Sequence, residues 1–327
     1  GSPFVDPYAA ASLHNKARAV AFTLPGSNVS YKGMRVQDGF RRAVYEQLSD
    51  ERTQIPKGGF SVKDMLYHLE QGHISIEKCP SCGAPGPHLF SKGKDESKCS
   101  GCEAAVYVTD SLRIHEQISD QGDNSAAITR FMNAIEHLQL ATLLKAMSDN
   151  NLSTVSATAI IVDGPLALFG QPARYHASIH AFYNGLFARC ADADLPPPVI
   201  MGLQKDGMVM DHARSLSPYL ENGSFCAISD KYRAEYINGI APLIDNFGHE
   251  TYYGQDFIYK TNSGRIFDIC LAYPFANKQN RKQFAEQKAD SKHYEPWLAR
   301  AFALVRHLEF DLYENSIVPV ALAHRHA

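Results

Sequence analysis

The sequence has no long hydrophobic run and no strong excess of charge of one sign. None of its apolar stretches reaches the length of about 18 residues that a membrane-spanning helix needs. Its 32 basic and 35 acidic residues leave a formal net charge of -3, so any nucleic-acid surface must be a local patch. With 45% apolar residues in 327, the chain is suited to a globular protein of about two domains.

Two nucleotide-binding signatures are also missing. The sequence contains neither a Walker-type phosphate loop nor a GxGxxG fingerprint, which disfavours a polynucleotide-modifying transferase on an α/β core.

The first residues lack the basic-then-apolar pattern of a secretory signal, and the seven cysteines are an odd number. Both observations argue against a secreted, disulfide-bonded protein, and we expect a cytoplasmic location.

Four of the cysteines form two closely spaced pairs. Cys79 and Cys82 form the first pair, Cys99 and Cys102 form the second, and sixteen residues separate the pairs. Two such pairs complete a tetrahedral four-thiolate zinc site. A redox pair is the alternative for either CxxC alone, but two pairs at this spacing favour zinc. Because four thiolates leave no open coordination position, we expect residues 79–103 to form a structural zinc ribbon that is not catalytic.

Alternating β-prone and helical stretches predict an α/β fold for most of the chain. Apolar runs predict strands over residues 104–109, 157–162, 199–203, 225–229, 257–261, 265–273 and 317–322. Helical patterns occur over residues 39–48, 61–71, 125–147, 175–188 and 295–308. Asn262-Ser263-Gly264 predicts a hairpin turn, so part of the sheet should be antiparallel. We expect a mixed sheet flanked by helices in residues 104–327, preceded by the ribbon and by a helical or extended region over residues 3–78.

Acidic residues follow two of the predicted strands. Asp110 ends the first strand and Asp163 ends the second. In open α/β sheets, ligands bind at the carboxyl ends of the strands, so both carboxylates are candidates for a shared site. The alternative is that Asp110-Ser111 and Asp163-Gly164-Pro165 serve as cap and turn residues.

A third acid, Glu136, falls within the apolar arc of its predicted helix. A carboxylate that faces a core is costly unless a cation or hydrogen bonds compensate it, so Glu136 is either a metal ligand or the partner of an arginine such as Arg113 or Arg130. The three acids together would suit Mg²⁺ or Mn²⁺ and phosphodiester cleavage. Lys205, after the third strand, could face a phosphate; a solvated loop lysine is the alternative.

Several short motifs in this order resemble those of the NurA nucleases. They are Val162-Asp163-Gly164-Pro165-Leu166, the run VIMGLQK that ends at Lys205, Gly254-Gln255-Asp256 through Lys260, and Pro319-Val320-Ala321-Leu322-Ala323-His324. The resemblance covers roughly residues 104–327 and rests on order and spacing. It implies an RNase H-like fold, a homodimer, and action on DNA with a hexameric HerA-type ATPase in DNA end processing or phage defence.

The resemblance also implies roles for single residues. The family's catalytic set falls on Asp110, Glu136 and Asp163 as Mn²⁺ or Mg²⁺ ligands, Lys205 beside the phosphate, and His324 as a metal ligand or phosphate contact. This chain has Asp110-Ser111 where the family has Asp-Gly-Ser, so Asp38-Gly39 is a rival for the first ligand. For His324 the alternative is a His-rich tail.

The sequence therefore predicts a metal-dependent deoxyribonuclease with a zinc ribbon. The alternative is a non-catalytic adaptor that binds DNA or a motor through the ribbon and carries a degenerate nuclease core. The two hypotheses differ in one result, because only the nuclease cleaves DNA when Mn²⁺ is supplied.

Overall fold

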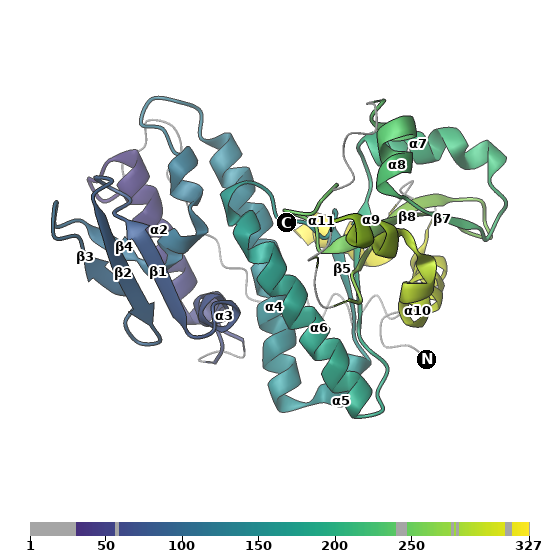
Figure 1. Ribbon diagram of the computed structural model, residues 1–327, viewed down its shortest axis with the longest axis horizontal. Coiled ribbons are helices and arrows are strands. Elements are labelled where there is room, and N and C mark those ends of the chain that lie inside the picture. Colours follow the sequence, from purple (N-terminus) through teal and green to yellow (C-terminus); the bar gives the residue numbers. More distant parts are fainter. Residues whose placement is uncertain are drawn as a thin grey trace. The chain divides into compact units, whose positions relative to one another are not determined.

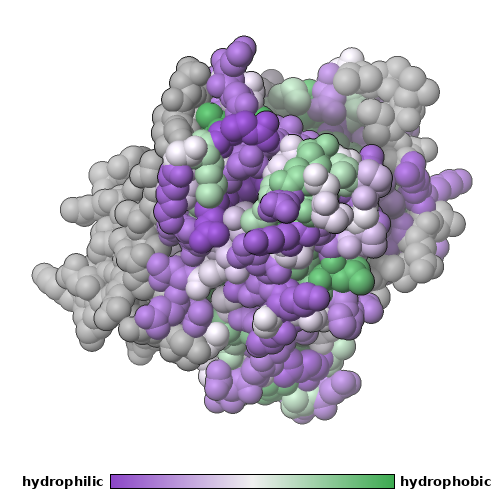
Figure 2. Space-filling model, turned by 90° about the vertical axis from the view of Figure 1, so that its left-hand side faces the viewer, coloured by the Kyte–Doolittle hydropathy of each residue, from purple (hydrophilic) through white to green (hydrophobic). Residues whose placement is uncertain are grey.

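The computed structural model describes residues 31–55, 59–239, 247–275, 278, 281–310 and 316–326, with side chains up to residue 322 except that of residue 52. The chain divides into two compact units, one ending at Thr142 and the other running from Leu143 to Arg325 (Figure 1). None of the described helices is long and apolar enough to cross a membrane. On the face in Figure 2, hydrophilic side chains predominate over small hydrophobic areas.

Two helices begin the described part of the first unit. They are α2 (Val36–Ser49) and α3 (Val62–Leu69), with a short 3-10 turn η1 (Glu51–Thr53) between them. Helix α3 begins with a capping box, because the Ser61 hydroxyl accepts the backbone N–H of Asp64 and the Asp64 carboxylate accepts that of Ser61. The buried face of α2 includes Phe40, whose ring meets Phe131 edge-on at 6.3 Å.

Two antiparallel hairpins carry the four paired cysteines. Strands β1 (His73–Lys78) and β2 (Pro85–Ser91) form one hairpin, and β3 (Glu96–Lys98) and β4 (Ala105–Tyr107) form the other. Residues 104–109 were expected in the mixed sheet, and that prediction is wrong. Only three of them are in a strand, which pairs with β3, because the chain turns at once into the 3-10 helix η2 (Val108–Leu112).

The second unit contains a five-stranded mixed sheet, as predicted. In spatial order its strands are β5 (Ala159–Asp163), β6 (Val199–Gln204), β9 (Ile266–Ala272), β8 (Gly254–Lys260) and β7 (Phe225–Ala227). Strands β5 and β6 run parallel, and the other neighbours pair antiparallel. The expected hairpin between β8 and β9 is present, and Gly264 at its turn has φ +92°, which suits glycine.

Helices cover both faces of this sheet. The helices from residue 125 onward are α4 (Ser125–Asn150), which begins in the first unit, α5 (Leu152–Ser156), α6 (His176–Asp192), α7 (Met208–Leu216), α9 (Arg281–Ala289), α10 (Glu295–Leu308) and α11 (Val318–His326). Short turns are η3 (Ile114–Gln117) in the first unit and, in the second, η4 (Gln171–Tyr175), η5 (Ser217–Tyr219), α8 (Asp230–Tyr232), the π-helical turn η6 (Arg233–Ile237) and η7 (Ser291–Tyr294). Helix α7 packs on Ile258, and α10 stacks Phe302 on Tyr259 at 4.1 Å. Since successive strand residues point to opposite faces, these two helices cover opposite sides.

The last apolar run is a helix rather than the predicted strand. Residues 318–326 form α11, and only Ile317 before them makes an isolated β-bridge, to Glu309. A short apolar run is compatible with either structure. Pro319 favours the helix, because proline fits the first helical turn and interrupts a strand ladder.

A close backbone approach fixes the loop that follows β5. A Cβ atom added to Gly202 would lie 2.1 Å from the carbonyl oxygen of Gly164, so only glycine fits there. Gly164 itself has φ +128°. The chain therefore turns sharply after Asp163 and crosses directly over β6.

Candidate metal centre and candidate active site

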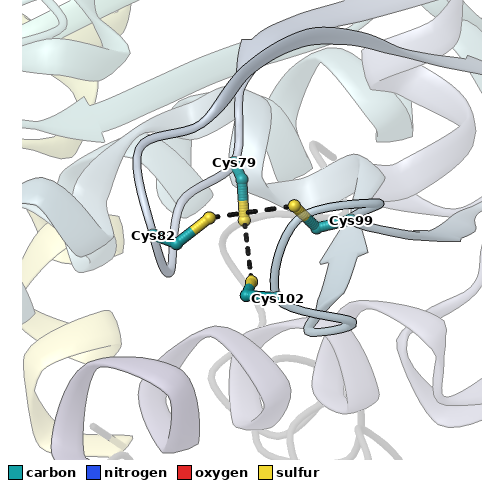
Figure 3. A group of neighbouring side chains, drawn as sticks. All are labelled: Cys79, Cys82, Cys99 and Cys102. Atoms are coloured by element: carbon teal, nitrogen blue, oxygen red, sulfur yellow. Dashed lines mark hydrogen bonds between the residues drawn. The ribbon is translucent and has the colours of Figure 1, made fainter.

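The four paired cysteines converge in the first unit. Their sulfur atoms all lie within 4.8 Å of one another, and the Cys79–Cys102 and Cys82–Cys99 sulfurs are each 3.8 Å apart (Figure 3). Tetrahedral zinc with Zn–S bonds of about 2.3 Å requires sulfur separations of about 3.8 Å, so the cluster fits this ion. The four cysteines therefore lie close enough to bind one metal ion.

The two cysteine turns have matching backbones. In the first, the N–H of Cys79 donates to the carbonyl of Ala84 at 3.0 Å, and in the second the N–H of Cys99 donates to that of Ala104 at 3.0 Å. Backbone N–H groups of Cys102 and Gly101 point at the Cys99 sulfur and lower the pKa of that thiol to about 7. This lowering favours the thiolate, which is the form that binds metal.

A buried arginine joins this cluster to the rest of the first unit. Arg41 of α2 donates to the hydroxyl of Ser81, which lies between Cys79 and Cys82, at 2.7 Å. Two further nitrogens of its guanidinium donate to both carboxylate oxygens of Asp110, at 2.9 and 2.6 Å. Charge-assisted bidentate pairs of this kind are strong and geometrically specific, so Arg41 holds the first cysteine turn and Asp110 in one arrangement.

Both rivals for the first catalytic ligand bind this same arginine. Asp110 lies in η2 with its side chain only 2% exposed, and it also accepts the backbone N–H of Tyr107 at 2.9 Å. Asp38 lies in the first turn of α2, where it accepts from Arg41 at 3.0 Å and from Ser81 at 2.7 Å. Both acids therefore have an arginine partner here, Asp110 also caps η2, and the metal-ligand role of either stays a prediction.

Glu136 does not face a core. Its side chain is exposed on α4, whereas the neighbouring His137 is buried. The expectation that this carboxylate is buried is wrong, because Met132 and Leu143, which widened the predicted apolar arc, are themselves 64% and 36% exposed. Asp110 and Glu136 belong to the first unit and Asp163 to the second, so the site of three acids stays a prediction.

Asp163 and Lys205 come together at one edge of the sheet. The ammonium nitrogen of Lys205 donates to Asp163 Oδ2 at 2.9 Å, and the side chains are 25% and 30% exposed. They meet because parallel strands end at the same edge, and β5 ends at Asp163 while β6 ends one residue before Lys205. Arg214 of α7 donates to the Lys205 carbonyl at 2.9 Å and holds its backbone.

This edge offers a carboxylate and an ammonium that solvent can reach. A carboxylate oxygen is a ligand that Mg²⁺ and Mn²⁺ prefer, and an ammonium can approach a phosphate. The fifth predicted residue, His324, falls in α11, but its side chain lies outside the described residues.

Sequence reasoning missed Arg41 and a pair of buried acids, Asp256 and Asp268. Arg41 sits between Phe40 and Ala43 on the buried face of α2, and this charged residue within an apolar face was a usable signal. Asp268 was visible as the one acid within the apolar strand β9.

Comparison with known proteins identifies no relative of the chain. No family model, no curated protein and no solved structure matches it. The NurA resemblance therefore stays a prediction from short motifs.

Proposed function

We propose that the chain is a divalent-metal-dependent deoxyribonuclease whose reaction takes place at the Asp163–Lys205 edge of the sheet. The observation that supports this function is the pairing of these two side chains at 2.9 Å, at the carboxyl ends of parallel strands. This is the place where α/β sheets bind ligands. A buried pair would serve stability alone, but both of these side chains are partly exposed.

Each residue has a separate task in this proposal. Asp163 would hold Mn²⁺ or Mg²⁺, an ion that would supply a water of lowered pKa and positive charge beside the phosphate. Lys205 would face the scissile phosphate, where its charge is more favourable in the transition state than in the ground state. Glu136, Asp110 or Asp38, and His324 remain the candidates for further ligands.

The wider assembly follows from the resemblance. We propose an RNase H-like core that works as a homodimer with a hexameric HerA-type ATPase on DNA in the cytoplasm. In this proposal the cysteine cluster binds zinc and stabilises the first unit. Four thiolates that already complete a tetrahedron leave no position for water, so zinc would not take part in cleavage.

Cleavage of labelled DNA in Mn²⁺ tests the function. We expect the wild-type chain to cut linear DNA, Asp163→Asn to abolish cutting, and Lys205→Met to slow it about 100-fold or more. Asp206→Asn is the matched control, because that carboxylate is adjacent in the chain but 94% exposed. It should cut at the wild-type rate.

The same assay separates the rival functions. A wild-type chain that binds DNA but never cuts it in Mn²⁺ would favour the adaptor hypothesis. Full activity in Asp163→Asn, with unchanged circular dichroism and zinc content, would show that the reaction takes place elsewhere.

A further inference from the structure

Three neighbouring strands place polar side chains on one face of the apolar sheet. Gln204 of β6 lies directly opposite Asp268 of β9, and Ile258 of β8 lies opposite Asp268 on its other side. Asp256 is two residues from Ile258 and shares its face, since side chains alternate along a strand. The side chains of Gln204, Asp268 and Asp256 therefore lie on the same face of three adjacent strands.

The two acids share one amide nitrogen. Nε2 of Gln204 donates to Asp268 Oδ2 at 2.6 Å and to Asp256 Oδ1 at 3.3 Å. Asp268 is fully buried, and Asp256 is 2% exposed. Two carboxyl groups thus lie side by side in the core, where like charges repel strongly.

Only one of these acids has a basic partner. Arg233 binds the second oxygen of Asp256, and it comes from the π-helical turn η6, a feature often found at functional sites. The nearby Asp230 is balanced by Lys288 at 2.6 Å. Within the described part of the chain, no ion pair joins Asp268 to a basic residue, and its Oδ1 is buried without a hydrogen-bond partner.

An uncompensated carboxylate in such a place is costly. Burial raises the pKa of Asp268 well above its ordinary range, and the charge of Asp256 raises it further while Arg233 lowers it. Native proteins rarely leave a buried carboxylate oxygen without a partner, so this oxygen calls for a ligand.

We propose that Asp256, Asp268 and the side-chain oxygen of Gln204 bind one hard metal cation between strands β6, β9 and β8. All three donors offer oxygen, the atom that such ions prefer. The amide of Gln204, which is only partly buried, turns its oxygen inward as the ion enters. The ion supplies the positive charge that Arg233 alone does not, and Asp268 Oδ1 gains a partner when this carboxylate binds the ion through both of its oxygens. The site is independent of the proposed nuclease reaction.

Binding of Mn²⁺ to the full, zinc-loaded chain tests this site. Electron paramagnetic resonance of free Mn²⁺ counts the bound ions, and the Asp163→Asn background removes the proposed catalytic site. We expect that background to bind one Mn²⁺. Adding Asp268→Asn, which keeps the side-chain shape, should weaken this binding at least tenfold, whereas adding the exposed control Asp206→Asn should leave it unchanged.

Equal binding with and without Asp268→Asn would overturn the proposal, and so would a background chain that binds no Mn²⁺. In either case the acid pair holds a proton instead. If the Asp268→Asn chain does not fold, the melting temperature of the Asp163→Asn chain is measured at increasing Mn²⁺ concentration instead. An ion that binds only the folded state must raise this melting temperature as its concentration rises. A melting temperature that does not respond to Mn²⁺ contradicts the site. Because no readout here is cleavage, failure of the nuclease proposal leaves this result intact.

Discussion

Replacing Asp110 by asparagine should destabilise the first unit strongly. The carboxylate accepts two charge-assisted hydrogen bonds from Arg41 and one from the backbone of Tyr107, in a place where both charged side chains are 2% exposed. The asparagine keeps the shape but removes the charge. Arg41 would then depend on Asp38, whose side chain is 25% exposed.

The expected loss is large for a single substitution. Removing one partner of a buried ion pair costs about 3–5 kcal/mol, because the remaining charge stays desolvated. Asp38 compensates in part, so we expect about 3 kcal/mol. With a urea dependence near 2 kcal/mol per molar, the unfolding midpoint should fall by about 1.5 M.

Release of the proposed zinc ion in urea, followed with a chromogenic chelator, measures the first unit specifically, because the four clustered cysteines all lie there. Glu116→Gln is the control, since it breaks the ion pair between Glu116 and Arg113. The Arg113 side chain is 54% exposed and that of Glu116 is 38% exposed. Exposed pairs contribute at most about 1 kcal/mol. If Asp110→Asn shifted the midpoint no more than Glu116→Gln, the structural role given to Arg41 would be refuted.

Two further predictions concern metal and pH. Removing the proposed zinc ion with a strong chelator should lower the urea midpoint of the first unit further than Asp110→Asn does. The fluorescence of Trp297, the one tryptophan, should still report a folded second unit, and a Trp297 signal lost together with the first unit would contradict this. Burial, aided by the charge of Lys278, lowers the pKa of His180 to about 4. The unfolded imidazole, with a pKa near 6.5, takes up a proton that the folded one does not, so stability falls as the pH drops from about 6.5 to 4. From about pH 8 to pH 5 the wild type should lose about 2 kcal/mol more than His180→Phe in urea titrations followed by Trp297 fluorescence, and equal losses would be inconsistent with this pKa.

Features encoded within a few residues were predictable from the sequence. The capping box of Ser61 and Asp64, the hairpin turn before Gly264 and the two cysteine turns each depend on contacts between near neighbours in the chain. The pairing of Asp163 with Lys205 was also within reach, since both follow strands that were predicted from their apolar runs.

Features set by distant contacts were not predictable. The apolar pattern of residues 317–322 fits a strand or a helix, and within that run Pro319 alone favours the helix α11 that forms. The exposure of Glu136 depends on which side of α4 the neighbouring elements cover, and helical periodicity alone does not give this. The partnership of Arg41 with Asp110 spans 69 positions in the sequence, and no local pattern announces it.

That long separation bears on what a metal crosslink can contribute. Arg41 and Asp110 are 69 positions apart, so their contact closes a loop of that length. A metal that joins Cys79 to Cys102 removes 23 positions from this loop and leaves 46. Closure entropy depends only on the logarithm of length, so the shorter segment saves about 0.4 kcal/mol. A bound ion would therefore contribute mainly by fixing the two cysteine turns to each other, and with them the Ser81 hydroxyl that accepts from Arg41. Replacing Ser81 would remove this link between the first cysteine turn and the helix without removing a single ligand.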